Sequence, residues 1–405
     1  MTNCKNCLAQ QVIPLFSFGN MPLANRLLKQ EDLSLTEPHF PLEMMLCTHC
    51  ALVQLKETIS PQSLYDEYLY FSSNSNTMVQ MAQKTVATVL NNLPEKDATI
   101  IEIASNDGYL LQHYLHKNFK ILGIEPAKNI AAFARLKNIP TISEYFSTHL
   151  ANQLVKEGMQ ADIIHANNVL AHAPDINDFV QGIKILLKPK GQAIIEVPYL
   201  LKLVEQGEFD TIYHEHVYYF SLTALEALFS RHHLIIKNLI EIPIHGGSLR
   251  LTIECNQSQS SAALLEKYLS HEKKLDIHSL NYYQPFIKKI NNLKSTLKEL
   301  LYSIKQQGKK IAAYGASAKG STLLNYFGIG AELIDFVVDK SPTKQGLYTP
   351  GNYLPIYPPE RLITEKIDFT LLLTWNFFEE ILKEQFAYRE MGGQFIIPIP
   401  QLEIK

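Results

Sequence analysis

The fold is decided by the stretch Ile100-Ile-Glu-Ile-Ala-Ser-Asn-Asp-Gly-Tyr-Leu-Leu111. Its β-branched front half predicts a buried parallel strand over 99–103. Residues 104–108 are small and polar and predict a tight turn, and a helix is expected over 109–115. A strand, a turn and a helix in this order present backbone N–H groups to a ligand at the carboxyl edge of an α/β sheet.

The residues around this turn indicate which ligand it binds. A second short strand, Ile121–Ile124, ends at Glu125, where such folds hold the hydroxyls of a ribose. The turn has a single glycine, so it suits a pyrophosphate poorly, because close backbone approach needs several. S-adenosylmethionine has no phosphate, and acid and amide side chains suit its ammonium and sulfonium charges. The candidates for its methionine end and ribose are Glu102, Ser105, Asn106, Asp107, Gly108 and Glu125; the alternative is an ordinary turn with surface polar residues.

Length and composition bound the remaining possibilities. A chain of 405 residues is long enough for more than one domain. A net charge of -3 with 19% charged residues argues against nucleic acid as a partner. No apolar run reaches the roughly 18 residues that a membrane span needs, and Met1-Thr-Asn-Cys-Lys lacks a signal-peptide core. We expect a cytoplasmic monomer that binds no membrane.

Four of the five cysteines form two C-x2-C pairs, Cys4/Cys7 and Cys47/Cys50. Each pair brings two thiolates to one tetrahedral metal, and zinc is the natural occupant. All four ligands are cysteine, which leaves no position open for water, so the pattern predicts structural zinc. Unrelated buried thiols are the alternative. The intervening segment Phe16–Arg26 reads as loop and turn.

Strands and helices alternate as far as residue 237 and predict a doubly wound parallel sheet. Tyr145 and Phe146 follow its third strand, where they could hold adenine. Asn167, Asn168 and His172 follow its fourth strand and should share the carboxyl edge with the first turn. The predicted elements are strands 99–103, 121–124, 141–142, 162–166 and 192–197 and helices 77–90, 128–136, 148–156 and 176–187.

The densest polar cluster is the segment 209–221, which contains Tyr213-His-Glu-His216. Two histidines around a glutamate could supply a base and an orienting carboxylate. A metal site using His214 and His216 is a competing interpretation, and aromatic packing with exposed histidines is a third. The tyrosine-rich segment 65–75 could line a domain interface, where ligands also bind.

The last third of the chain predicts a second α/β unit. Residues 262–307 have helical periodicity and should form a connector of two helices, and His245-Gly-Gly-Ser-Leu-Arg250 precedes them in a strand-like stretch. Gly315-Ala-Ser-Ala-Lys-Gly320 follows a predicted strand but lacks the ending of a P-loop, so ATP hydrolysis is not implied. A diphosphate could rest on its N–H groups and Lys319. Further strands are expected within 333–339, 369–374 and 395–399.

These pieces in this order resemble the three-domain, zinc-containing nucleotide-sugar C-methyltransferases. The resemblance covers essentially the whole chain and adds Gly123-Ile-Glu-Pro126 and Lys344-Gln-Gly346 to the segments already quoted. It implies a zinc-binding domain at 1–75, a Rossmann-like methyltransferase domain at 76–240 and a second Rossmann-like domain with its helical connector at 241–405, which helps to hold the nucleotide sugar. Tyr213, Glu215, His216 and His172 match positions that line the reaction site. The implied contacts are Tyr70 for the methyl donor and Asn168, Tyr68, His245, Ser248, Arg250, Ser317, Lys319 and Lys344 for the sugar nucleotide.

The reaction that the resemblance implies is methyl transfer to C3 of a 4-keto-6-deoxy sugar on a nucleoside diphosphate, most simply thymidine diphosphate. Carbon must lose a proton before it accepts the methyl group, and the adjacent ketone spreads the resulting charge. His216 is the expected base, with Glu215 orienting the site and Tyr213 and His172 donating hydrogen bonds. Neighbours on a strand point to opposite sides, so the segment 213–216 should not be a straight strand. O- or N-methylation of a sugar nucleotide and a non-catalytic nucleotide-binding scaffold are the alternatives.

Overall fold

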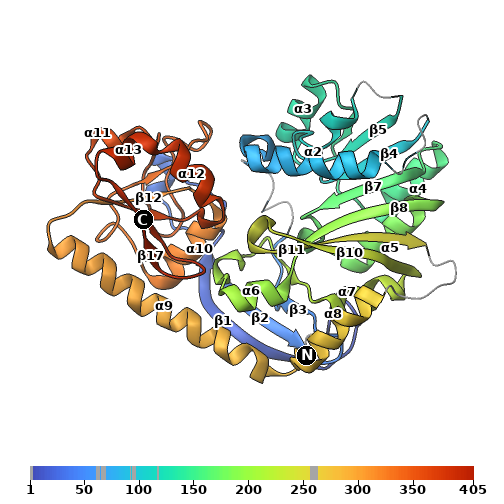
Figure 1. Cartoon of the computed structure of the whole chain (residues 1–405), viewed down its shortest axis with the longest axis horizontal. Coiled ribbons are helices and arrows are strands. Elements are labelled where there is room, and N and C mark those ends of the chain that lie inside the picture. Colours follow the sequence, from blue (N-terminus) through green and yellow to red (C-terminus); the bar gives the residue numbers. More distant parts are fainter. Residues whose placement is uncertain are drawn as a thin grey trace.

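The computed structural model describes residues 3–60, 64, 70–91, 93, 97–115, 118–255 and 263–405. These residues form three sheets, one of four, one of seven and one of six strands (Figure 1). The predicted α/β fold with an N-terminal zinc module and two Rossmann-like units is confirmed. No helix in the described ranges is long and apolar enough to cross a bilayer. The cytoplasmic location and the monomeric state stay predictions.

The N-terminal sheet is built on a long antiparallel hairpin. Strand β1 (Val12–Pro22) pairs with β2 (His39–Cys47), from Val12 opposite Cys47 to Pro22 opposite His39. The prediction of loop and turn over Phe16–Arg26 is therefore wrong as far as Pro22. Two irregularities in register, one of them around Gly19 (φ +75°), let the strand continue through a sequence that reads as a turn. The remaining strands are β3 (Val53–Leu55) and β9 (Tyr218–Tyr219), so the chain of the middle unit completes this sheet.

The middle sheet has the order β10-β11-β8-β7-β4-β5-β6. Its parallel strands are β4 (Thr99–Ile103), β5 (Lys120–Ile124), β6 (Thr141–Ile142), β7 (Ala161–Asn167) and β8 (Leu187–Pro198). The antiparallel strands β10 (Leu234–Ile242) and β11 (Ser248–Cys255) extend it beyond β8. The sheet thus continues past residue 240, while the expected domain boundaries stay predictions.

Alternate residues of β4 face opposite layers of helices. Ile100 packs with α2 (Asn76–Leu90), whereas Ile101 and Ile103 pack with a second layer of helices. That layer consists of α4 (Thr148–Lys156), α5 (Ile176–Leu186) and α7 (Leu222–Arg231). The helix α3 (Lys128–Leu136) follows β5, and α6 (Leu200–Gln206) follows β8.

The helix expected over 109–115 is wrong in type and length. The chain forms only a short 3-10 turn, η3 (Leu111–Tyr114), and becomes extended at Leu115. Leu110, Leu111 and Tyr114 are buried in the layer beneath α2, so packing rather than helix propagation fixes this connection.

The C-terminal sheet has the order β14-β13-β12-β15-β16-β17, with only β17 antiparallel. Its strands are β12 (Ile311–Tyr314), β13 (Val337–Val338), β14 (Ile356–Tyr357), β15 (Phe369–Leu372), β16 (Gln394–Ile397) and β17 (Glu403–Ile404). The helices of this unit are α10 (Ala318–Phe327), α11 (Arg361–Thr364), α12 (Phe378–Glu384) and α13 (Phe386–Glu390).

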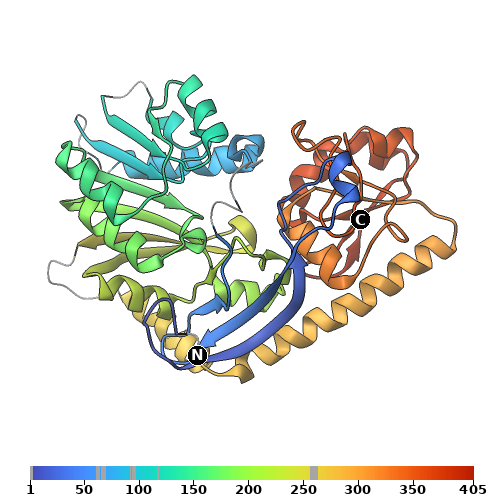
Figure 2. The same cartoon turned by 180° about the vertical axis from the view of Figure 1, so that it is seen from behind.

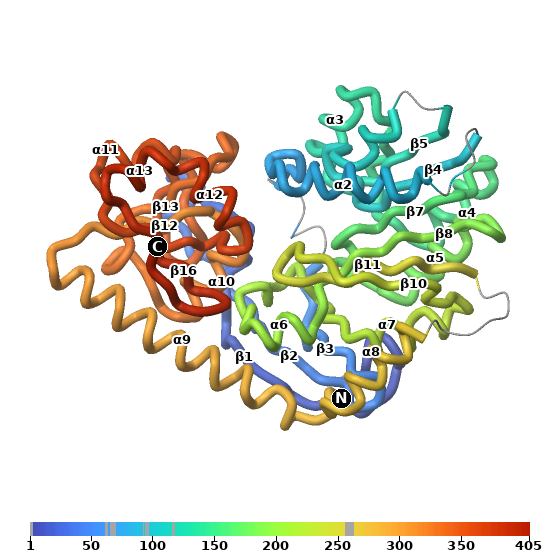
Figure 3. Tube along the Cα trace, viewed as in Figure 1, coloured from blue at the N-terminus to red at the C-terminus, as the bar shows by residue number. Residues whose placement is uncertain are grey.

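Two helices and the N-terminal hairpin connect the α/β units. The connector consists of α8 (Ala263–Lys274) and α9 (Leu280–Gln306), as predicted. Figure 2 shows α9 running beneath the C-terminal unit from behind, and the tube in Figure 3 follows β1 from near the N-terminus to the C-terminal unit. Buried side chains of α9, including Phe286 and Leu297, pack in the same core as Phe18 of β1 and Leu371 of β15.

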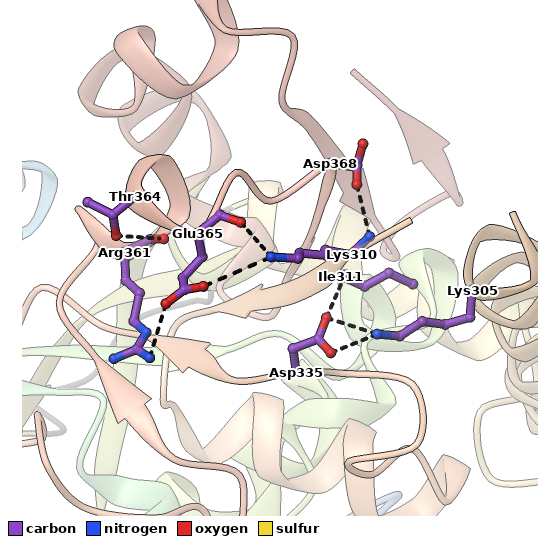
Figure 4. A network of polar contacts seen from close by, with 8 residues as sticks. All are labelled: Lys305, Lys310, Ile311, Asp335, Arg361, Thr364, Glu365 and Asp368. Atoms are coloured by element: carbon purple, nitrogen blue, oxygen red, sulfur yellow. Dashed lines mark hydrogen bonds and ion pairs between the residues drawn. The ribbon is translucent and has the colours of Figure 1, made fainter. Parts of the chain in front are cut away.

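A polar network fastens the end of α9 to the start of β12 (Figure 4). The Lys305 ammonium lies 2.8 Å from both oxygens of Asp335, and one of these oxygens accepts the N–H of Ile311. Asp368 accepts the N–H of Lys310 at 2.9 Å. The network lies at the amino end of β12 and leaves the carboxyl end for a ligand.

Candidate active site

The four cysteines meet in one cluster. All four sulfur atoms lie within 4.8 Å of one another, with Cys4 and Cys50 at 3.6 Å and Cys7 and Cys47 at 3.7 Å. Sulfur atoms on one tetrahedral zinc ion, each about 2.3 Å from the metal, are separated by roughly 3.8 Å. The sulfur positions therefore fit zinc with four protein ligands, which is the arrangement of a structural site.

A cavity of about 1040 Å³ lies where the three parts of the chain meet. Its walls include residues of the N-terminal segment 23–32, of the carboxyl edge of the middle sheet and of the loops that follow β12, β13 and β15. No cysteine of the cluster lines it. The predicted site residues that line it are Tyr70, Asn106, Glu125, Tyr145, Phe146, Asn167, Asn168, His172, Tyr213, Glu215, His216, His245, Ser317, Lys319 and Lys344.

The turn after β4 is held by Glu125 at the end of β5. One oxygen of Glu125 accepts the N–H of Asn106 at 3.0 Å and the other accepts the N–H of Ala127 at 2.9 Å. Ala104 and Asn106 have positive φ values of 56° and 48°, which turn the backbone sharply at the sheet edge. Burial raises the pKa of Glu125 to about 7, although the two N–H groups oppose the shift.

Two neighbouring amides at the end of β7 carry unpaired oxygen atoms. The Oδ1 atoms of Asn167 and Asn168 are buried and have no hydrogen-bond partner among the described residues. Both side chains line the cavity, and Asn168 has a positive φ of 54°. A buried acceptor without a partner costs free energy, so these oxygens are suited to accept hydrogen bonds from a ligand. The amino and hydroxyl groups of S-adenosylmethionine fit that need.

Several residues that were predicted to bind S-adenosylmethionine do not line the cavity. Asp107 contacts Ser73 and pairs with Lys137 at 3.0 Å. A Cβ at Gly108 would meet Ile139 at 2.3 Å, so packing requires this glycine. Glu102 and Ser105 are buried within the sheet layer and do not line the cavity either. Their predicted direct contacts are therefore not brought to the cavity by this structure. Tyr68, like Tyr65, lies outside the described residues.

The segment 213–216 forms a turn, as predicted. The N–H of His216 donates to the carbonyl of Tyr213 at 2.9 Å, and the side chains of Glu215 and His216 both line the cavity. The His216 Nδ1 atom lies 2.8 Å from the carbonyl oxygen of Thr211, and its Nε2 atom lies 2.8 Å from the Tyr213 hydroxyl. Since a carbonyl only accepts, Nδ1 carries the hydrogen and Nε2 accepts from Tyr213.

The pKa values of the two cavity histidines are lowered. Burial lowers the pKa of His216 well below its usual value, and His172, Lys319 and His245 add to the effect. Burial also lowers the pKa of His172 to about 4. Because both pKa values are lowered, both imidazoles are neutral near pH 7. The centroids of the two rings are 4.7 Å apart.

His214 does not join this pair. Its Nε2 atom lies 3.3 Å from the carbonyl oxygens of Phe40 and Pro41, on β2, and the side chain does not line the cavity. Within the described ranges, the cysteine quartet is the only group with metal-ligand spacing. The interpretation of His214 and His216 as a metal pair is therefore wrong.

The loop after β12 brings positive charge to the cavity. The Lys319 ammonium lies 4.3 Å from the centroid of the Trp375 ring and is buried without a hydrogen-bond partner among the described residues. Lys344 donates to the carbonyl of Ala316 at 2.7 Å and lies 3.6 Å from Asp339. The Ser317 hydroxyl accepts the N–H of Gly320 at the start of α10.

Two predicted substrate contacts are not brought to the cavity. Arg250 pairs with Glu196 at 2.5 Å across the β11–β8 ladder, and Ser248 donates to the carbonyl of Ile244 at 3.0 Å. Neither residue lines the cavity, whereas His245 of the same segment does. His245 lies in a short turn between β10 and β11 with φ +53°, so the segment is not a continuous strand.

The cavity contains residues that the sequence did not single out. Asn25 belongs to the turn that follows β1, and its amide contacts Glu215. Lys340 and Glu380 line the cavity and pair at 3.0 Å, and Glu380 also accepts from Thr77 of α2 at 2.7 Å. For Asn25, the available signal is the polar pair Asn25-Arg26, which begins three residues after Pro22.

Solved structures of methyltransferases share low similarity with the chain. A magnesium protoporphyrin IX methyltransferase from Synechocystis with bound S-adenosylmethionine is 13% identical, with a TM-score of 0.34, covering 43% of this chain and 78% of that chain. The 1,6-didemethyltoxoflavin-N1-methyltransferase of Burkholderia thailandensis is 15% identical, with a TM-score of 0.32, covering 44% and 78%.

Sequence models and a full-length relative are more informative. A zinc binding domain model matches residues 4–65, a methyltransferase domain model matches 78–234, and a C-methyltransferase C-terminal domain model matches 243–400. The C-methyltransferase NovU of Streptomyces niveus is 32% identical over 400 residues, which cover 98% of this chain and 95% of the relative. Carbon, rather than oxygen or nitrogen, is the methylated atom in both descriptions, which decides against the O- and N-methylation and scaffold alternatives. The chain belongs to the family of S-adenosylmethionine-dependent C-methyltransferases that combine a zinc-binding domain, a methyltransferase domain and a C-terminal C-methyltransferase domain.

Proposed function

We propose that this C-methyltransferase acts on C3 of a 4-keto-6-deoxy sugar carried by a nucleoside diphosphate, most simply thymidine diphosphate. The C3 proton leaves first, and the electrons of the C–H bond form an enolate with the C4 ketone. The enolate carbon then takes the methyl group, which S-adenosylmethionine supplies when bound. The protein must therefore provide a base for C3, hydrogen-bond donors for the C4 oxygen and separate places for a cationic donor and an anionic acceptor.

The observation that carries this proposal is the protonation geometry of His216. Because its Nδ1 hydrogen is committed to the Thr211 carbonyl, the lone pair of Nε2 is directed toward the Tyr213 hydroxyl in the cavity. A neutral imidazole with this orientation can accept the C3 proton at Nε2, while the Tyr213 hydroxyl turns to the C4 oxygen. His172 lies beside His216 and can donate to the same oxygen.

The charge of the cavity walls supports the two ligand positions. Asn106, Glu125 and Asn167 line one side, together with Tyr70 and Tyr145, and would hold S-adenosylmethionine. Lys319 and the N–H groups at the start of α10 line the other side and would hold the diphosphate. Pockets for single ligands are typically about 300–1,000 Å³, and this cavity of about 1040 Å³ has room for a donor and an acceptor.

The test is exchange of hydrogen at C3 in deuterium oxide. The enzyme is incubated without a methyl donor with a 4-keto-6-deoxyhexose linked to thymidine diphosphate, and deuterium at C3 is followed by proton NMR. We expect exchange with the wild-type enzyme. The variant His216→Asn should lower both exchange and methyl transfer by roughly 10²–10⁴-fold. Methyl transfer at a near-normal rate by His216→Asn would remove His216 from the role of base.

A further inference from the structure

Asn25 connects the N-terminal zinc module to Glu215 in the cavity. Its amide nitrogen lies 2.7 Å from one carboxyl oxygen of Glu215 and 2.9 Å from the other. The two residues are far apart in the sequence, and both side chains line the cavity. The two N–H bonds of an amide diverge too widely to point at both oxygens of one carboxyl group, so a single N–H of Asn25 is shared between them.

The turn that carries Asn25 is held at both ends. It begins where β1 ends at Pro22, and the N–H of Arg26 donates to the carbonyl of Leu23 at 3.1 Å. Leu28 then exchanges two backbone hydrogen bonds with Tyr348 of the C-terminal unit, at 2.9 and 2.8 Å. Asn25 is thus placed by two parts of the molecule against a residue of the third.

The arrangement suits an ionised carboxyl group. An N–H shared between both oxygens favours a carboxylate, in which both oxygens accept, whereas a protonated carboxyl carries a hydrogen on one of them. Glu215 is 3% exposed, and burial raises its pKa to about 7, while the contact with Asn25 lowers it. No charged side chain contributes to that shift. Titratable side chains that line the same cavity include Arg26, His172, Tyr213, His216, His245 and Lys319.

We propose that Asn25 is a positioning residue that fixes the Glu215 side chain in the cavity and favours its carboxylate form. The inference rests on the proposed function, in which Glu215 belongs to the reaction site. It adds a task for the N-terminal module, which then sets the charge of a group at the reacting end of the cavity. That task is separate from the folding role of the zinc cluster.

The test is the pH dependence of kcat/KM for methyl transfer by the full-length, zinc-loaded enzyme. If the reaction requires ionised Glu215, kcat/KM should rise with pH on the acidic side of the profile. The apparent pKa of this acidic limb should lie near 7. Asn25→Ala removes this donor and should move this limb upward by roughly 1–2 pH units, the equivalent of a lost hydrogen bond to a charged group. Asn25→Asp preserves size but makes two carboxyl groups share the space, so its limb should move at least as far.

The matched control is Asn20→Asp, which adds the same charge at an exposed position of β1 outside the cavity. Its limb should coincide with that of the wild type, and zinc content verifies that each variant keeps its module. A fall in rate with an unmoved limb in both Asn25 variants would overturn the inference. If Glu215→Gln abolishes the limb in that case, the proposed function survives alone. If Glu215→Gln and His216→Asn both keep normal rates, the proposed function and the inference fail together.

Discussion

The first loops of the two α/β units are held in the same way. In the middle unit, Glu125 at the end of β5 accepts the N–H of Asn106 at 3.0 Å. In the C-terminal unit, Asp339 after β13 accepts the N–H of Ala316 at 2.8 Å. Both loops also begin with a residue of positive φ, Ala104 at 56° and Gly315 at 99°. An acid that directly follows the next strand therefore holds the turn in each unit.

The two loops differ in the charge that they bring to the cavity. The loop after β4 lies beside the buried carboxyl groups of Glu102 and Glu125, whereas the loop after β12 contributes the Lys319 ammonium, which has no hydrogen-bond partner among the described residues. In the proposed function the cationic methyl donor binds on the first side, where its charge would favour the ionised form of Glu125, and the anionic acceptor binds on the second. If these positions are correct, a few ionisable side chains assign two similar loops to ligands of opposite charge.

Loss of the zinc cluster should disrupt the folding of the chain and therefore both loops. This is the largest effect that we expect. Cys47→Ser opens a closed four-cysteine site whose metal contributes folding energy. Cys47 also packs in the same core as Ile101 and Ile103 of β4. We expect folded yield and zinc content to fall in parallel, measured by circular dichroism and metal analysis. Cys255→Ser, at the cysteine outside the cluster, is the control; a folded, active, zinc-free Cys47→Ser protein would refute a structural role.

A change in the second loop alone should separate the two ligands. Lys319→Met removes the buried ammonium and keeps much of the side-chain volume. The KM for the sugar nucleotide should rise roughly 10–100-fold, the value of a lost hydrogen bond to a charged group. The Kd for S-adenosylmethionine, measured by calorimetry, should stay within about twofold of the wild type. Lys288→Met, on the exposed face of α9, is the control. A weaker Kd for S-adenosylmethionine with an unchanged KM for the sugar nucleotide would assign the loop after β12 to the methyl donor instead.

The smallest effect concerns the acid of the first loop and is seen in stability. The pKa of Glu125 is raised from 4.5 to about 7 by burial, so the folded protein binds an extra proton between these values. This contribution to stability is present below pH 4.5 and is lost as the pH rises through 7. Glu125→Gln should reduce the pH dependence of the unfolding free energy by roughly 1 kcal/mol per pH unit in that window. Urea unfolding at several pH values measures it, with the exposed Glu390→Gln as control. An unchanged slope would place the Glu125 carboxyl in an environment without a raised pKa.

The local elements of the middle unit could be predicted from the sequence. The strand 99–103 and the helices 128–136 and 148–156 lie at the predicted residues, because hydrophobic periodicity and turn residues are local signals. The turn at 213–216 was also predictable, since two adjacent side chains had to face one cavity.

Contacts between distant segments could not be predicted in this way. Phe16 to Pro22 looks like a loop because its strand partner lies beyond residue 38 and two irregularities interrupt the alternation. Arg250 carries a charge that suits a diphosphate, but the ladder sets it opposite Glu196. The hydrogen bond between Asp210 and Trp375, at 2.7 Å, joins two units whose packing no local pattern encodes.

The N-terminal hairpin has a consequence for exchanging modules between relatives. Phe18 packs against Tyr326 with ring centroids 4.8 Å apart, Leu28 is bridged to Tyr348, and Glu37 accepts the N–H of Gly351 at 2.8 Å. A chimera could be made with the C-terminal half of a relative in order to change the sugar-nucleotide specificity. In that chimera the residues on the two sides of these contacts would not match. If residues 16–37 are taken from the same relative as the C-terminal half, these contacts stay native. The smallest unit that can be exchanged therefore consists of two segments that are separate in the sequence.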